Sequence, residues 1–221
     1  MKDVFLDTDP GIDDAMALIY LASCPSVNIR AISTVMGNAS LDNCTANALF
    51  LKEKFRLTAP IYRGASLCIN GKEPHSFPDH VHGKNGLGDV VPINTELCCE
   101  SHSAHSAMAN LALQSPSKIT LLAIGQLTNV ALAMLAQVSF SKDLKEIIFM
   151  GGSLNVPGNV TTWAEANIYG DPEAAEIVLR SEVPITMVGL DVTMKTRISQ
   201  SFLKDLTSRL GDLGRFLDEI N

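Results

Sequence analysis

The chain has 221 residues, enough for one α/β domain with a single substantial core. Hydrophobic residues make up 46% and charged residues 19%, as in globular proteins, and the net charge of −7 argues against a nucleic-acid partner, which would require a basic surface. No apolar run is long enough to span a membrane, and the five cysteines contain no C-x-x-C pair, so we expect reduced thiols in a cytoplasmic protein.

Strand-like and helix-like patterns alternate along the chain. Apolar, β-branched runs predict strands at 4–6, 28–36, 60–62, 119–123, 146–150 and 184–188. Helical spacing predicts helices at 15–21, 41–55, 101–114, 129–137 and 171–180, the last capped by Asp171. Residues 64–94 are rich in Gly, Pro and His and are interpreted as a long functional loop. This alternation predicts one α/β domain, with a mostly parallel central sheet and helices on both faces.

An acidic turn separates the first predicted strand from the first predicted helix. It places four carboxylates within eight residues, Asp7-Thr8-Asp9-Pro10-Gly11-Ile12-Asp13-Asp14. Like charges this close repel one another unless a cation or strong donors lie among them. We therefore expect a rigid, oxygen-lined cup for a hard cation such as Ca²⁺ or Mg²⁺. The alternative is an exposed turn that caps the helix, which would explain one or two of the aspartates.

The same stretch resembles the D-x-D-P-G-x-D-D signature of the inosine–uridine-preferring nucleoside hydrolases. The resemblance implies that Asp9 binds Ca²⁺ and acts as the general base. It implies that Asp14 is a second metal ligand and that Asp13 holds ribose hydroxyls. It also implies a nucleoside hydrolase-like α/β fold.

Two further turns resemble the same family. Gly37-Asn38 resembles its strand-end Gly-Asn, which implies that Asn38 contacts the nucleoside; on its own, Asn38 is an ordinary turn residue. Residues 124–129 (IGQLTN) resemble a G-P-L-T-N turn, with Gln126 in place of the usual proline. This implies that the Thr128 carbonyl is the third protein ligand of calcium. Without the resemblance, Thr128 and Asn129 are an ordinary helix N-cap.

Residues 159–169 (NVTTWAEANIY) resemble the family's G-N-x-T-x-x-A-E-x-N segment, and 171–175 (DPEAA) reproduce the helix start that follows it. The resemblance implies that Asn159, Glu165 and Asn167 bind ribose hydroxyls, for which such side chains supply directed donors and acceptors. It also implies that Met150 lines the sugar pocket, although a methionine at a strand end is otherwise a core residue. A solvated polar loop is the alternative for 159–169.

All five histidines lie between residues 75 and 105. Cys98, Cys99, His102 and His105 would supply zinc-ligand types, but adjacent cysteines are a poor start for a tetrahedral site. Residues 82–88 (HGKNGLG) resemble the family's H-G-x-x-G-L loop over the active site. This implies that His82 faces the base or guards the entrance.

Together these residues imply hydrolysis of the N-glycosidic bond of ribonucleosides through a Ca²⁺-bound water, with Asp9 as base. The expected partners are a ribonucleoside substrate and further copies of the chain in a dimer or tetramer. Two alternatives remain. One is a D-x-D phosphatase with Asp7 as nucleophile and Asp9 as acid; the other is a non-enzymatic nucleoside- or ribose-binding protein on the same scaffold.

Family members continue to a late His-Asp pair, which completes the calcium shell and serves protonation of the leaving base, and nothing in this sequence resembles it. Met194 also stands where the family usually has His after L-D-V-T. Leucines 206, 210, 213 and 217 recur at helical spacing and Ile220 extends the stripe, which predicts an apolar face in need of a partner. We therefore expect a C-terminally truncated domain that hydrolyses nucleosides very slowly or not at all.

Overall fold

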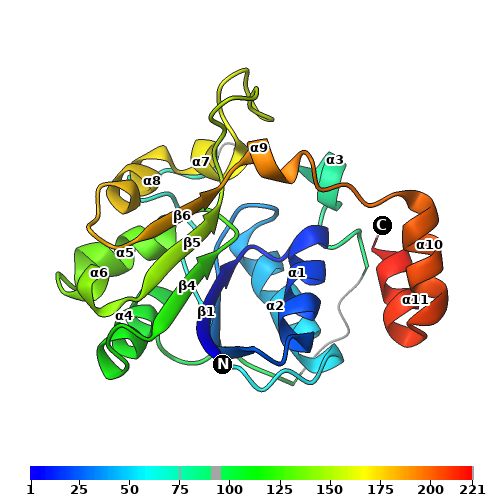
Figure 1. The fold of residues 1–221 in the computed structure, drawn as a ribbon, viewed down its shortest axis with the longest axis horizontal. Coiled ribbons are helices and arrows are strands. Elements are labelled where there is room, and N and C mark those ends of the chain that lie inside the picture. Colours follow the sequence, from blue (N-terminus) through cyan, green and yellow to red (C-terminus); the bar gives the residue numbers. More distant parts are fainter. Residues whose placement is uncertain (75, 91–95, 221) are drawn as a thin grey trace.

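The structure is a computed structural model that describes residues 1–74, 76–90 and 96–220 (Figure 1). Six parallel strands form one sheet in the order β3-β2-β1-β4-β5-β6. Their bounds are β1 (Lys2–Thr8), β2 (Val27–Thr34), β3 (Ile61–Arg63), β4 (Ile119–Ala123), β5 (Glu146–Met150) and β6 (Ile185–Val188). The predicted parallel sheet is therefore confirmed.

Helices cover both faces of this sheet, as predicted, with α4, α5, α6 and α8 on one face and α1 and α2 on the other, and α11 packs on the outer side of that second layer (Figure 1). The helices described are α1 (Ile12–Ser23), α2 (Leu41–Lys54), α3 (Asp79–His82), α4 (Ala104–Gln114), α5 (Thr128–Ala136), α6 (Phe140–Asp143), α7 (Ala166–Gly170), α8 (Pro172–Leu179), α9 (Leu190–Thr193), α10 (Gln200–Arg209) and α11 (Asp212–Glu219). The sequence does not predict α3, α6, α7 or α9, because four or five residues are too few to show helical periodicity.

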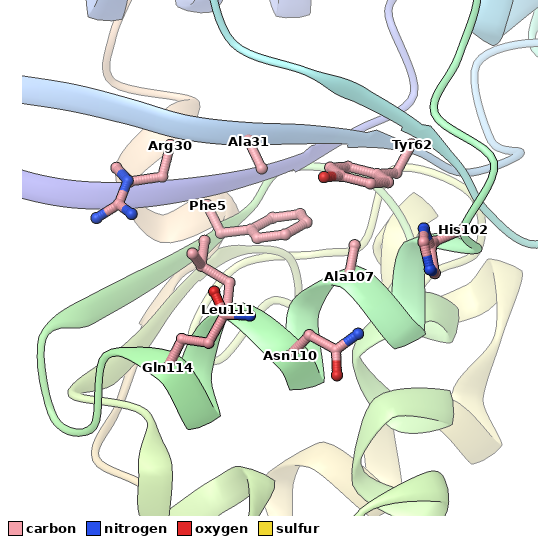
Figure 2. Close-up of a pocket in the computed structure, with 9 residues that line it drawn as sticks. All are labelled: Phe5, Arg30, Ala31, Tyr62, His102, Ala107, Asn110, Leu111 and Gln114. Carbon is pink, nitrogen blue, oxygen red and sulfur yellow. The ribbon is translucent and has the colours of Figure 1, made fainter.

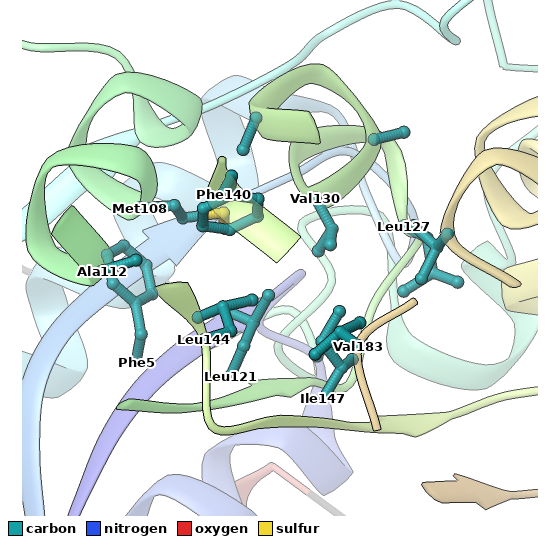
Figure 3. Close-up of a cluster of buried hydrophobic side chains, with 14 of the residues drawn as sticks. Phe5, Met108, Ala112, Leu121, Leu127, Val130, Phe140, Leu144, Ile147 and Val183 are labelled. Carbon is teal, nitrogen blue, oxygen red and sulfur yellow. The ribbon is translucent and has the colours of Figure 1, made fainter. Parts of the chain in front are cut away.

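Alternating side chains of the strands form two hydrophobic clusters. Phe5 belongs to the cluster under α4, α5 and α8, which also contains Leu121 and Phe140 (Figure 3). The next residue along the strand, Leu6, belongs to the opposite cluster. Since both faces are buried, the strand residues read as continuous apolar runs rather than as alternating ones.

The C-terminal stripe differs from its prediction in two ways. Gly211 takes a φ of +57° and separates α10 from α11, so the leucines do not lie on one helix. In addition, Phe216, Leu217 and Ile220 are buried in the second cluster, where Phe216 packs against Phe50. The expected unpartnered apolar face is therefore wrong, because most of the stripe packs onto the domain itself.

Two smaller expectations concern cysteines and membranes. Each of the five cysteines is a free thiol, as predicted. Among the described residues, no helix has the length and apolarity needed to cross a bilayer.

The strand order reverses between β1 and β4, the two central strands. The chain runs outward from β1 through β2 to β3, and the later strands run outward from β4 in the opposite direction. In open parallel sheets, ligands bind beyond the carboxyl ends of the strands at such a reversal. The residues that follow β1 and β4, which include Asp9 and Gln126, occupy this position.

Asp7 introduces a carboxyl group into the interior of the sheet. Its Oδ1 accepts hydrogen bonds from Ser33 Oγ (2.5 Å) and Asn129 Nδ2 (2.8 Å), whereas Oδ2 has no partner among the described residues. Burial raises the pKa of Asp7 from 3.8 to about 7. The folded state therefore binds an extra proton between these values, so the free energy of unfolding due to Asp7 falls as the pH rises through this range.

We predict that Asp7→Asn becomes more stable relative to the parent as the pH rises from 4 to 8. The amide keeps an acceptor for Ser33 and Asn129 but cannot ionise, so the relative gain should be on the order of 1–4 kcal/mol. Urea unfolding at both pH values measures it. Asp3→Asn is the control: a hydrogen bond from Asn28 lowers the pKa of Asp3, so the stability that its charge contributes is lost mainly below pH 4, and its relative stability should change only slightly, and in the opposite direction, between pH 4 and 8. If the difference in the free energy of unfolding between Asp7→Asn and the parent does not vary with pH, the prediction is contradicted.

Candidate functional site

The four aspartates of the acidic turn lie in different surroundings. Asp7 is fully buried below the turn, whereas the Asp13 side chain is 81% exposed. Only Asp9 and Asp14, which are 2% and 4% exposed, meet beyond the end of β1. The predicted oxygen-lined cup can therefore use two of the four carboxylates, Asp9 and Asp14, and its binding of a cation stays a prediction. This separation reduces the like-charge repulsion that the spacing implied.

Asn38, from the loop after β2, joins the two buried carboxylates. Its backbone N–H donates to Asp9 Oδ2 (2.8 Å), and its Nδ2 donates to Asp14 Oδ2 (2.9 Å) and to the Asp9 carbonyl (3.1 Å). Donation to a carboxylate favours its charged form. Asn38 therefore fixes the position of both acids.

Asp14 also caps α1. Its Oδ2 accepts a hydrogen bond from the Gly11 N–H (3.1 Å), and its Oδ1 accepts one from Thr8 Oγ1 (2.5 Å). The capping alternative is thus correct for one of the four aspartates. It does not account for Asp9.

Two glycines enclose the Asp9 carboxylate. A Cβ at Gly37 would lie 2.0 Å from Asp9 Oδ2, and a Cβ at Gly125 would lie 2.6 Å from Oδ1. Larger residues would displace the carboxylate, which explains the glycine at both strand ends. Asp9 Oδ1 is buried and has no hydrogen-bond partner among the described residues. An unpartnered oxygen of this kind is costly and is suited to a ligand that supplies a cation or a donor.

Without such a ligand, the surroundings favour the neutral acids. Burial raises the pKa of Asp9 well above its usual range, and the neighbouring Asp14 raises it further. Burial likewise raises the pKa of Asp14 to about 7, with the charge of Asp13 adding to the effect. A divalent cation beside these oxygens would favour the ionised forms instead. The donor set, two buried carboxylates with one free oxygen, fits a hard cation better than a soft one.

A cavity of about 440 Å³ opens beside Asp9 at the carboxyl edge of the sheet. It collects polar side chains from segments far apart in the sequence, together with apolar and aromatic ones. It is lined by Asp9, Gly37, Asn38, Pro74, Ser76, Phe77, Pro78, His80, Gln126, Asn159, Val160, Ala166, Asn167, Tyr169 and Gly170. The cavity thus brings together four of the predicted site residues: Asp9, Asn38, Asn159 and Asn167.

Two of the residues predicted to bind the sugar, Asn159 and Asn167, each keep part of their side-chain amide available, one as a donor and the other as an acceptor. Asn159 Oδ1 accepts a hydrogen bond from the Ala166 N–H (2.9 Å), so its amide N–H groups are the part that can turn to the cavity. Asn167 uses its Nδ2 to donate to the carbonyls of Ile124 (3.0 Å) and Met150 (3.1 Å), so its Oδ1 is the remaining acceptor. A hydroxyl group can accept from the first and donate to the second.

Glu165 and Met150 lie behind this wall. Glu165 is buried and caps α7, because its oxygens accept from the N–H groups of Gly152, Asn167 and Ile168. Met150 contacts the Asn167 amide through its sulfur (3.4 Å). Both residues support the cavity wall in this structure. Their contact with a sugar stays a prediction.

The two histidines near the acidic turn have different positions. His82 Nδ1 accepts a hydrogen bond from the Ile12 N–H (3.3 Å) and lies 3.9 Å from Asp13 Oδ1. Burial lowers the pKa of His82, which favours the neutral ring that this acceptor role requires. His80, which the sequence does not single out, lines the cavity instead. The predicted roles of His82 at the base and of Asp13 at the ribose are not tested by these positions.

Thr128 is the first residue of α5, and Leu127 is its N-cap, so the Thr128-Asn129 cap reading is wrong. The Thr128 hydroxyl donates to Asp171 Oδ2 (2.6 Å), and Asp171 caps α8 as predicted. The role of the Thr128 carbonyl as a metal ligand stays a prediction. Asp191, near Met194, accepts from the backbone of residues 154 and 155 and fixes the loop after β5.

Asn129 and Gln126 are functional candidates that sequence reasoning misses. Asn129 Nδ2 donates to Asp7 Oδ1 (2.8 Å) and to the Thr34 carbonyl (3.0 Å), so it ties β1 to β2 from the start of α5. Gln126 lines the cavity and is 5% exposed. The signal for Gln126 is its departure from the resembled turn, which indicates a changed side chain next to Asp9.

A second cavity, of about 200 Å³, lies between α4 and strands β2 and β3, away from the acidic turn (Figure 2). Its floor contains the stacked rings of Phe5 and Tyr62. The guanidinium of Arg30, which lines this cavity, forms an ion pair with Asp3, with 2.9 Å between Nη1 and Oδ2. None of the predicted site residues lines this cavity.

Two of the alternatives from the sequence lose support. In the described part of the chain, no group of three or more His, Cys, Asp or Glu side chains is arranged to hold a metal, so Cys98, Cys99, His102 and His105 do not form a zinc site. A phosphatase would need Asp7 as a nucleophile facing the substrate. Asp7 is fully buried and hydrogen bonded under the turn, which does not suit that role.

Residues 4–221 match the family model described as inosine-uridine preferring nucleoside hydrolase. The chain is 38% identical to uridine nucleosidase 1 of Arabidopsis thaliana over 220 residues, covering 99% of this chain and 65% of that protein. It is 34% identical over 221 residues to the pyrimidine-specific ribonucleoside hydrolase RihB of Escherichia coli, covering 99% of this chain and 69% of that protein. The chain thus spans about two thirds of the length of these curated relatives.

Solved structures agree with these relatives. A plant nucleoside hydrolase aligns with a TM-score of 0.94 at 36% identity, over 98% of this chain and 68% of that one. A purine-preferring ribonucleoside hydrolase from Gardnerella vaginalis aligns with a TM-score of 0.94 at 30% identity, over 99% of this chain and 70% of that one. The predicted fold is confirmed by both.

We predict that Asn38→Leu lowers the free energy of unfolding by about 2 kcal/mol, because the Asp14 carboxylate and the Asp9 backbone carbonyl both lose the Nδ2 donor, while the Asp9 carboxylate keeps the backbone N–H of residue 38. The loss should grow as the pH rises, since the Asn38 side chain favours the ionised form of Asp14. Urea unfolding at pH 5 and pH 8 measures both effects. Asn43→Leu is the control, because the Asn43 side chain donates to the Lys84 carbonyl and to neither of the two acids. Equal losses in the two variants at both pH values would contradict the bridging role.

Proposed function

Because the chain belongs to the inosine–uridine preferring nucleoside hydrolase family, we propose that it hydrolyses the N-glycosidic bond of ribonucleosides to ribose and the free base. The observation that carries the proposal is Asp9, a buried carboxylate with one unpartnered oxygen, beside a cavity lined by amides. This combination supplies an acceptor for a water proton and hydrogen-bonding groups for a polyol. A homo-oligomer and a cytoplasmic location stay predictions.

A hard cation fits this site. Asp9 and Asp14 would hold it, with the Thr128 carbonyl proposed as a further ligand, and Ca²⁺ is the cation that such oxygen donors favour. When bound, it would supply Lewis acidity, which lowers the pKa of a water molecule. It would also offset the repulsion between the two buried carboxylates.

Asp9 would act as the general base. The Asn38 N–H occupies Asp9 Oδ2, so Oδ1 is the oxygen left to accept a proton from water. The water oxygen forms a bond to the anomeric carbon while the bond to the base nitrogen breaks, and the pair of electrons leaves with the base. The sugar carries positive charge in this transition state, which a neighbouring carboxylate stabilises.

The residues that line the cavity are of two chemical kinds, which match the two parts of a nucleoside. Asn159 and Asn167 offer a donor and an acceptor near Asp9, and we assign them to ribose hydroxyls. Phe77, Pro78 and Tyr169 offer apolar and aromatic surface, which suits the faces of a nucleobase. His80 lies in the same lining and would meet the polar edge of the base.

We predict that the chain releases ribose and uracil from uridine, at the very low rate that the sequence leads us to expect, and that Asp9→Asn lowers kcat by a further factor of about 10²–10⁴, the usual contribution of a general base. Uridine should also exceed 2′-deoxyuridine in kcat/KM by roughly 10²-fold or more, because the missing hydroxyl leaves site groups unpaired. Reducing-sugar release and chromatography of the base measure both. Uridine is the first substrate because two of the relatives cited are named for uridine or pyrimidine substrates.

Asp218→Asn, an exposed change in α11, is the control for Asp9→Asn and should leave kcat unchanged. If neither uridine nor inosine is cleaved by the parent, the proposed hydrolysis is refuted. If both nucleosides bind without cleavage, the non-enzymatic binding alternative is supported instead. Equal rates for uridine and 2′-deoxyuridine would remove the amides from the sugar site.

We further predict that Ca²⁺ raises the Tm of the chain and that Asp14→Asn abolishes this effect. A hundredfold excess over Kd stabilises by about 2.7 kcal/mol, which corresponds to roughly 5–10 °C for a domain of this size. Differential scanning calorimetry with Ca²⁺ or EDTA measures it without reference to activity. Asp218→Asn should keep the full shift. An equal shift in Asp14→Asn would show that the cation binds elsewhere.

A further inference from the structure

Gln126 is a buried side chain with a carbonyl oxygen that lacks a hydrogen-bond partner among the described residues. It is 5% exposed, and its Oε1 is buried without a partner in the described part of the chain. The residue follows Gly125, which packs against the Asp9 carboxylate, and it lines the cavity beside Asp9. Buried polar atoms are otherwise almost always paired.

The surroundings of Gln126 leave little free space around its amide. A Cβ at Gly170, on α7, would lie 2.4 Å from Gln126 Nε2 and 2.5 Å from its Cδ, so α7 approaches the amide closely. Gly170 lines the same cavity. The glycine makes room for a glutamine amide at this position, and the amide remains at the cavity wall. A site that keeps a buried carbonyl oxygen unpaired at a free-energy cost has a use for it when ligand is present.

We infer that Gln126 is a specificity-determining residue whose amide binds a ribose hydroxyl of the nucleoside. The inference rests on the proposed function and extends it to a residue that departs from the resembled turn. A hydroxyl donates to Oε1 and accepts from Nε2, which satisfies both ends of the amide. The position favours the sugar over the base, because Gln126 directly follows Gly125, which packs against Asp9, and Asp9 is the acid proposed to act at the anomeric carbon of the sugar.

The inference predicts that removing the Gln126 amide weakens the action on substrate without lowering the stability of the fold. Gln126→Leu has nearly the same volume and removes a buried carbonyl oxygen that has no partner among the described residues. Its Tm should therefore equal or exceed that of the parent. Its kcat/KM for uridine should fall by about tenfold, the value of one neutral hydrogen bond in a desolvated site.

The test compares parent and Gln126→Leu on uridine and on its 2′-, 3′- and 5′-deoxy analogues. In the parent, each missing hydroxyl lowers kcat/KM by some factor. In Gln126→Leu, the factor for one hydroxyl should shrink about tenfold while the other two stay as they are. Gln114→Leu, on the exposed end of α4 away from the site, is the matched control and should change none of the factors.

The outcomes separate the inference from the function on which it rests. If the parent cleaves uridine but all three factors are unchanged in Gln126→Leu, the inference is overturned and the hydrolase remains. If the change appears instead between uridine and N3-methyluridine, Gln126 reads the base and the ribose assignment is overturned. A Tm lowered by several degrees with unchanged factors would show a structural role only. If uridine binds without cleavage, calorimetric Kd values for the same ligands replace kcat/KM; without binding, the inference falls together with the proposed function.

Discussion

The position of the Asp9 carboxylate is the constraint on which the site depends. The carboxylate lies at the point where the strand order reverses, between Gly37 after β2 and Gly125 after β4. The two glycines let two strand ends approach one acidic side chain, and the Asn38 N–H fixes one of its oxygens. Every other feature of the site, from the free oxygen to the amides across the cavity, is arranged around an acid that protein groups satisfy only in part.

The acidic turn shows how the fold resolves crowding of charge. The chain directs Asp7 into the sheet, Asp13 to solvent and only Asp9 and Asp14 to the site. Asn129 makes the first of these possible, because it donates to Asp7 from the start of α5. Burial then leaves Asp7 and Asp14 with pKa values near neutrality, so the cost of keeping carboxyl groups in this region depends on pH and on what binds there.

Much of this architecture could be predicted from the sequence, because strand runs and helical spacing of ten or more residues carry a strong signal. The resemblance also identified Asp9, Asn38, Asn159 and Asn167, all of which line one cavity. Short helices such as α7 carried no periodicity, and the fate of each aspartate could not be read from spacing alone. The direction of a side chain depends on partners such as Asn129, 122 residues away from Asp7, and no local pattern encodes such a contact. For the same reason, the C-terminal stripe looked unpartnered although Phe216 packs on Phe50.

The two halves of the sheet contribute different chemistry to the cavity. The half that begins at β1 supplies charge, through Asp9 and Asp14 with Asn38 between them. The half that begins at β4 supplies neutral amides, through Gln126 after β4 and Asn167 on α7. Charged groups can bind a cation and move a proton, whereas neutral amides discriminate hydroxyl groups by direction and by the cost of leaving them unpaired. The reversal point therefore joins a catalytic half to a selective half, and a substitution in one half can change selectivity without removing the acid on which hydrolysis would depend.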